Sequence, residues 1–139
     1  MLKKTIAYTD YNGTNRTEDF YFNLTRTEIA EMEYNTGTSK SFTGLIQEIV
    51  DSNDIGKIIS IMKELILKSY GVKSDDGRRF IKNDDVREAF EQNPAFDELY
   101  MELSTDPNKA TEFITGIIPS NLAEKMNVNG SNAVLKSVK

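Results

Sequence analysis

Residues 54–70 read DIGKIISIMKELILKSY, and this stretch decides the fold. Its apolar residues recur every three or four positions, a spacing that places them on one face of an α-helix. They are Ile55, Ile58, Ile59, Met62, Leu65, Ile66 and Tyr70. Ile61 and Leu67 widen this face, so we expect the longest helix of the chain to lie at the centre of the core. Gly71 ends it.

Three more helices are predicted after this segment, and each begins at a residue that caps helix N-termini. Asn83 caps a helix that runs to Phe90. Asn93 and Asp106 each precede a proline, the residue favoured at the first helical position. The apolar residues of the last two helices keep helical spacing: Phe96, Leu99, Tyr100 and Leu103, then Ala110, Phe113, Ile114 and Ile117.

The N-terminal residues alternate with the period of a β-strand. In residues 2–9 and 18–24 the apolar side chains fall on one parity: Leu2, Ile6 and Tyr8, then Phe20, Phe22 and Leu24. Asn12-Gly13 lies between the two segments and is a strong turn signal. We predict a β-hairpin whose apolar face packs on the helices, because a lone hairpin is only marginally stable in water.

Two helices are predicted between the hairpin and the central segment. Thr25 and Glu28 form a capping box, in which the threonine hydroxyl accepts from the Glu28 amide and the glutamate accepts from the cap amide. This short helix ends near Gly37, because glycine readily adopts the left-handed conformation that follows a helix. A second helix spans about residues 41–51.

The segment 72–83 is polar and contains the turn signal Asp76-Gly77, which leaves room for a second small hairpin. Pro119 stops the last long helix, and Ser120 caps one more turn that runs to Met126.

The predicted fold class is α+β and predominantly α-helical, with the N-terminal hairpin packed on a bundle of about five to six helices. Residues 1–126 are expected to form a single globular domain, with the hairpin in 2–24 and the helical part in 25–126. Residues 127–139 are rich in Asn, Ser and Gly and are expected to form a flexible tail.

Composition narrows the function classes. The chain has 139 residues, no Cys, no His and a net charge of −5. Missing histidine removes the side chain best suited to acid–base catalysis at neutral pH and the commonest metal ligand. The lack of a basic cluster argues against nucleic-acid binding. No apolar run approaches the roughly 20 residues of a membrane span, and no signal peptide is apparent, so we expect a cytoplasmic protein.

The acidic clusters have structural explanations. Asp51 and Asn53 match the opening of a calcium loop, but Ile55 and Met62 replace two required oxygen ligands. Asp75-Asp76 precedes a glycine in a turn, and Asp84-Asp85 lies in a first helical turn, where acids favour the positive end of the helix dipole. We therefore predict no catalytic, cofactor-binding or metal-binding residues, and no enzymatic activity.

Two residues depart from the apolar patterns and are our candidates for contact with a partner. Tyr21 lies on the parity opposite Phe20 and Phe22, and tyrosine is enriched at protein interfaces. A tyrosine packed beneath a helix explains it equally well. Met101 departs from the apolar stripe of its helix, although a single exposed methionine needs no functional explanation.

Three stretches resemble the tail assembly chaperones of long-tailed bacteriophages, especially phages of Gram-positive bacteria. They are the hairpin with its flanks (residues 8–25), the middle run 66–80, and the late run 96–103 with 113–119. The resemblance covers about residues 3–122.

This resemblance implies a non-catalytic protein that binds the tape measure protein, keeps it soluble and helps to recruit the tail-tube protein. It also implies a role in the host cytoplasm and absence from the mature virion, and self-association remains open. The alternatives are a structural virion protein, such as a head–tail joining or minor tail subunit, and a small regulator that binds a host protein.

Overall fold

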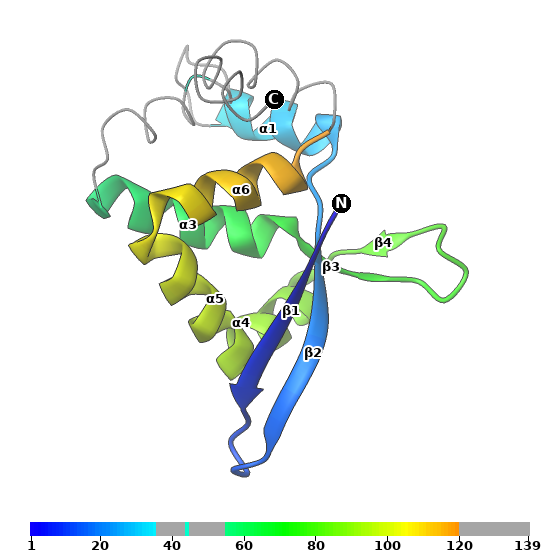
Figure 1. Ribbon diagram of the computed structural model, residues 1–139. Coiled ribbons are helices and arrows are strands. Elements are labelled where there is room, and N and C mark those ends of the chain that lie inside the picture. Colours follow the sequence, from blue (N-terminus) through cyan, green and yellow to red (C-terminus); the bar gives the residue numbers. More distant parts are fainter. Residues whose placement is uncertain (36–43, 45–54, 120–139) are drawn as a thin grey trace, which may run out of the picture.

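The computed structural model describes residues 1–35, 44 and 55–119 (Figure 1). Within these residues an N-terminal strand pair is followed by helices and a second, shorter strand pair. The elements are β1 (Leu2–Thr9), β2 (Asn15–Phe22), α1 (Arg26–Asn35), α3 (Ile55–Ser69), β3 (Tyr70–Lys73), β4 (Phe80–Ile81), α4 (Asp84–Glu91), α5 (Pro94–Thr105) and α6 (Pro107–Ile117). The fold is α+β and predominantly helical, as predicted.

The strands form one antiparallel sheet in the order β1-β2-β3-β4. The β1–β2 turn forms where Asn-Gly predicts it: Gly13 has a φ of +83°, and the Asp10 carboxylate accepts from the amides of Asn12 and Thr14, both at 2.9 Å. A positive φ suits glycine because it has no Cβ. The β3–β4 pair is the second small hairpin, with Gly77 at a φ of +74°.

Helix α3 lies at the centre of the core, as predicted. Met62, Leu65 and Ile66 are fully buried, and the helix contacts α4, α5 and α6. One boundary was wrong. Tyr70 was predicted as the last helical residue, but it begins β3, pairs with Phe22 in the sheet, and stacks on Phe90 with ring centroids 4.2 Å apart. Sheet pairing and aromatic packing, which bring in residues far along the chain, override its helical spacing.

The predicted capping residues form hydrogen bonds at the N-termini of their helices. Asn83 accepts from the Val86 amide at 2.8 Å, Asn93 from the Ala95 amide at 2.9 Å, and Asp106 from the Asn108 amide at 3.0 Å. The capping box of α1 also forms: the Glu28 amide donates to the Thr25 hydroxyl, and the Thr25 amide donates to the Glu28 carboxylate.

Two predicted segments lie mostly or wholly outside the described residues. Of the helix predicted at 41–51, only Gly44 is described, and it is helical. The turn of helix after Ser120 and the tail at 127–139 are not described.

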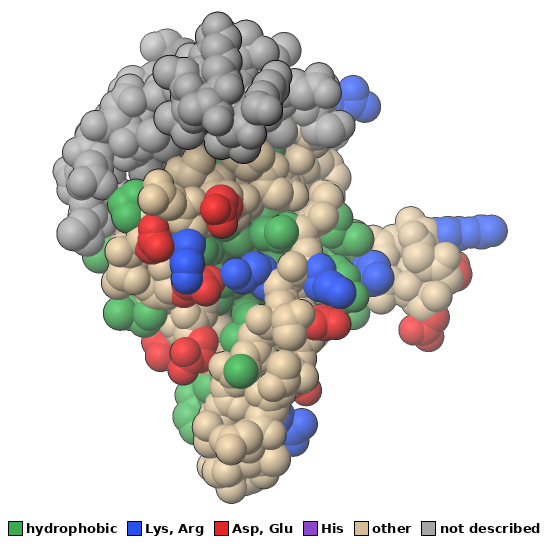
Figure 2. Space-filling view, viewed as in Figure 1, with side chains coloured by type: hydrophobic (Ala, Val, Ile, Leu, Met, Phe, Trp, Pro, Cys, Tyr) green, Lys and Arg blue, Asp and Glu red, His purple; other side chains and the backbone are tan. Residues whose placement is uncertain are grey.

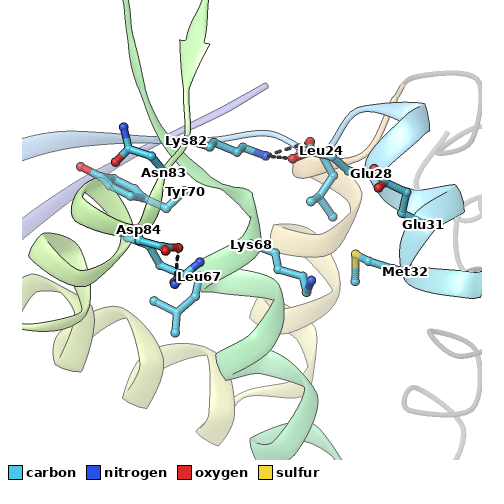
Figure 3. A pocket seen from close by; sticks show the side chains of 11 residues that line it. Leu24, Glu28, Glu31, Met32, Leu67, Lys68, Tyr70, Lys82, Asn83 and Asp84 are labelled. Atoms are coloured by element: carbon cyan, nitrogen blue, oxygen red, sulfur yellow. Dashed lines mark hydrogen bonds and ion pairs between the residues drawn. The ribbon is translucent and has the colours of Figure 1, made fainter. Parts of the chain in front are cut away.

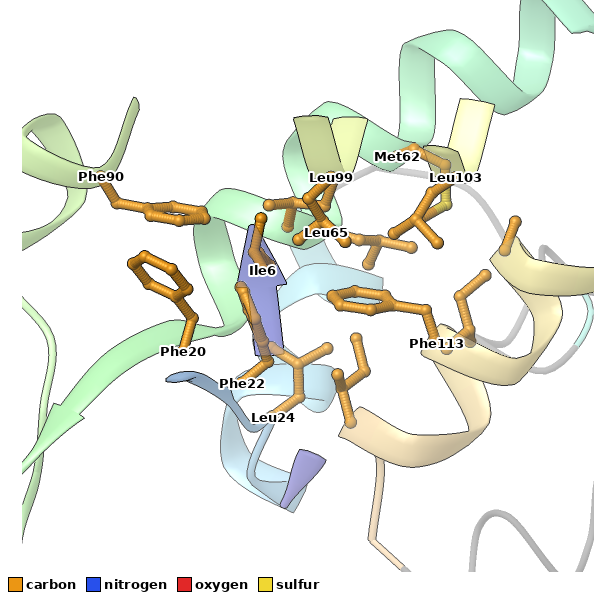
Figure 4. Packing of buried hydrophobic residues seen from close by; sticks show 14 of the residues in the cluster. Ile6, Phe20, Phe22, Leu24, Met62, Leu65, Phe90, Leu99, Leu103 and Phe113 are labelled. Carbon is orange, nitrogen blue, oxygen red and sulfur yellow. The ribbon is translucent and has the colours of Figure 1, made fainter. Parts of the chain in front are cut away.

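The helices cover one face of the sheet and build a single core against it. Aromatic rings carried by β2, α4 and α6 meet there: the Phe22 ring lies 5.7 Å from that of Phe90 and 5.2 Å from that of Phe113 (Figure 4). The turn of the β1–β2 hairpin and the β3–β4 hairpin extend beyond the helices (Figure 1). Among the described residues, the outer face of the sheet and the outward sides of the helices are the exposed surfaces.

Candidate partner-binding surfaces

The first candidate surface lies where α3 meets α5. Ile59 on α3 is 41% exposed and Met101 on α5 is 51% exposed, so both are large apolar residues at the surface. The hydroxyl of Tyr100, the residue before Met101, donates to the Ile59 carbonyl at 3.2 Å. One turn earlier on α5, the Phe96 ring stacks on that of Tyr100 with centroids 5.8 Å apart. We call Ile59, Phe96, Tyr100 and Met101 the α3–α5 strip.

The strip forms because α5 turns only part of its apolar side inward. Leu99 and Leu103 are buried against the core, and Phe96 and Tyr100 are half-buried beside them. Met101, two positions after Leu99, points away from that buried side, as the periodicity predicts. Figure 2 shows apolar side chains at the surface on the side of the molecule where α3 and α5 lie. The strip is thus a partly exposed apolar surface on α3 and α5.

Ile59 corrects a prediction. Its spacing placed it with the buried residues of the central helix, but its side chain is exposed. Helical spacing does not show which turns of α3 a neighbouring helix covers. Helix α5 contacts this turn of α3 through the Tyr100 hydroxyl and leaves the Ile59 side chain exposed. No signal in the sequence separates Ile59 from Met62.

The second predicted contact residue, Tyr21, lies on the outer face of the sheet. It pairs with Gly71 of β3, and the Lys73 ammonium lies 4.3 Å from the centre of its ring. The neighbouring Phe80 ring lies directly over Gly71, so close that a Cβ there would be 2.6 Å from it. Tyr21 is therefore half-buried among sheet residues.

The structure does not bring Tyr21 and Met101 together. Tyr21 faces outward from the sheet, whereas Met101 lies on α5, which contacts β1 from the side of the core. A salt bridge of 3.0 Å between Lys4 and Glu102 fixes α5 to that side. The two predicted residues belong to two separate surfaces, and only Met101 is part of the α3–α5 strip.

A cavity of about 350 Å³ lies between α1, the end of α3 and the start of α4 (Figure 3). Its central cation is Lys82, whose ammonium donates to both Glu28 carboxylate oxygens at 2.8 and 2.7 Å and to the Asn23 carbonyl at 2.6 Å. Burial lowers the pKa of Lys82, and the Glu28 carboxylate opposes that shift. Because all three ammonium donors are satisfied, Lys82 acts as a cross-link between α1 and the end of β4.

Two acidic clusters lie in a turn and in the first turn of a helix, as the sequence suggested, whereas Asp51 and Asn53 of the calcium-like segment lie outside the described residues. The Asp76 carboxylate accepts from the Ser74 hydroxyl at 2.7 Å and from the Arg78 amide at 3.0 Å, bonds that lower the pKa of Asp76. Asp84 pairs with Arg87 at 2.8 Å within α4. These carboxylates shape a turn and a helix end.

Two features are absent from the residues that the structure describes. In that part of the chain no helix is long and apolar enough to cross a membrane. The same residues contain no group of three acidic side chains placed to hold a metal ion.

A family model described as phage tail assembly chaperone matches residues 1–138, which is nearly the whole chain. No curated protein and no solved structure matches this chain.

Proposed function

The chain belongs to the phage tail assembly chaperone family, and from that premise we propose that it binds the tape measure protein and assists assembly of the tail tube around it. The proposal includes action in the cytoplasm of the host bacterium, absence from the mature virion and no catalytic step. It also includes contact with the tail-tube protein and, between copies of the chain, self-association.

The α3–α5 strip is the observation that supports client binding. A long helical client offers apolar stripes that need cover before the tail assembles, and proteins bind such stripes with exposed apolar surfaces flanked by polar groups. Ile59 and Met101 provide exposed apolar surface. Tyr100 is held in place beside them by its hydrogen bond to the Ile59 carbonyl and by stacking on Phe96. Aromatic residues and methionine are enriched at the centres of protein interfaces.

Co-expression with the tape measure protein of the same phage tests this function. We expect the wild-type chain to keep the client soluble and to co-purify with it. A variant with both Ile59→Glu and Met101→Glu should lose most of the bound client, because two buried charges would oppose the contact. Val72→Glu is the matched control, since Val72 is 43% exposed but lies on β3, outside the strip.

Three results would count against the proposal. A client that stays insoluble beside the wild-type chain removes the chaperone function. A double variant that binds as well as the control removes the α3–α5 strip from it. Mass spectrometry that finds the chain at stoichiometric levels in purified virions favours a structural virion protein instead.

A further inference from the structure

Strand β1 forms an open edge of the sheet, because no strand among the described residues pairs with its outer side. The direction of its backbone groups follows from the turn: the Asp10 amide donates to the Thr14 carbonyl at 2.9 Å, so the Asp10 backbone points toward β2. Backbone groups alternate along an antiparallel strand. The backbone groups of Lys3, Thr5, Ala7 and Thr9 therefore point to the open edge, and their side chains are exposed on the outer face of the sheet.

A hollow of about 190 Å³ lies beside this edge, between β1 and α5. Its lining is mixed: Ile6 and Leu99 are apolar but almost fully buried, and Glu98 and Glu102 line its α5 side. Unpaired backbone donors and acceptors beside a hollow that accepts side chains are the features by which a sheet takes up an additional strand. We propose that β1 binds an extended segment of a partner protein by β-strand addition, an inference independent of the tape measure protein.

The charged residues around the open edge of β1 indicate which side chains a bound partner segment would carry. Glu102 already pairs with Lys4, but within the described residues neither Glu98, on the core side, nor Lys3, on the outer side, has an ion pair. A complementary strand therefore alternates, with apolar and basic side chains toward the hollow and acidic side chains outward beside Lys3. A second copy of β1 fits poorly, since it brings two lysines and no acid, and lysines on edge strands oppose pairing with a like strand.

The test uses two fluorescent synthetic peptides of equal composition. One alternates as Glu-Val-Glu-Lys-Glu-Val-Glu, and the other carries the same residues with the acids grouped together. We expect saturable binding of the alternating peptide by fluorescence anisotropy, with amide chemical-shift changes at Lys3, Thr5, Ala7 and Thr9. The grouped peptide should bind at least several-fold more weakly because it cannot present both faces.

Three variants locate the binding. Ala7→Pro removes a backbone donor that points to the open edge and leaves the β1–β2 ladder intact, so affinity should fall about tenfold or more. Ala7→Val keeps the donor and is the matched control, with affinity close to wild type. Glu98→Lys tests the hollow without touching the strand and should weaken binding several-fold.

The proposal is overturned if neither peptide binds, if the grouped peptide binds equally well, or if Ala7→Pro melts normally and binds as tightly as wild type. It is also overturned if light scattering shows a wild-type dimer that Ala7→Pro converts to monomer. In that case the edge is occupied by a second copy.

Discussion

The two faces of the sheet are built from neighbouring residues of the same strands, yet the side chains on them have different surroundings. On the inner face Phe22 has no exposed surface, and it contacts aromatic rings from α4 and α6. On the outer face the adjacent Tyr21 is half-buried, with the Lys73 ammonium 4.3 Å from the centre of its ring. The comparison teaches that strand alternation gives neighbouring residues opposite surroundings: one parity builds the core, and the other stays at the surface of the sheet.

The largest expected effect is at Phe22. We expect Phe22→Ala to lower the free energy of unfolding by about 3–5 kcal/mol, because it removes buried contacts and leaves a cavity. Tyr21→Ala should lower the free energy of unfolding by under about 1 kcal/mol. The ring is partly exposed, so its removal loses little buried surface and a single cation–aromatic contact. Urea unfolding of both variants measures the difference. Equal losses would mean that the two faces contribute equally to stability.

A smaller effect is expected where the outer face is most tightly packed. Gly71→Ala places a methyl group against the Phe80 ring, and we expect a loss of about 1–3 kcal/mol in unfolding free energy. Adding Phe80→Ala should restore part of this loss, because the ring that the methyl group meets is gone. A double-mutant cycle by urea unfolding measures this coupling. Simple additivity would show that the strain lies elsewhere.

The smallest expected effect is at the far end of the β1–β2 hairpin. The Arg16 guanidinium, which donates to Asp10 at 2.6 Å, lowers the pKa of that carboxyl below its ordinary value of 3.8, and the Thr14 amide adds to the shift. Ionised Asp10 therefore contributes stability above pH 3.8, and this contribution is lost as pH falls through the folded-state pKa.

Thermal melts of the wild type and of Asp10→Asn measure that contribution. The two melting temperatures should differ slightly at neutral pH and converge as the solution becomes acidic. A difference that stays constant across this pH range would show that the variant acts through the turn geometry rather than through the charge of Asp10.

Much of the fold is predictable because its signals are local. The capping box at Thr25 and Glu28 and the caps at Asn83 and Asn93 each depend on residues within three positions, and all of them form. The Asn12-Gly13 turn is likewise local. Such features are independent of the rest of the chain, so one sequence suffices to find them.

The candidate surfaces were less predictable, because exposure depends on what packs nearby. Met101 was singled out by its position off the apolar stripe, and it is indeed exposed. Ile59 carried the same signal as its buried neighbours on α3. The open edge of β1 was not predictable from the sequence. It follows from the strand order, in which β3 pairs with the other side of β2 and leaves β1 at the end of the sheet.

The sequence by itself determined the element types, most of their boundaries and the absence of histidine and cysteine chemistry, because these follow from residue identity and short-range spacing. Only the tertiary structure decided that Tyr70 leaves the helix, that Lys82 bonds Glu28 across 54 positions, and which apolar residues stay at the surface. These outcomes depend on segments distant in sequence meeting in space, where the free energy of packing outweighs local preference.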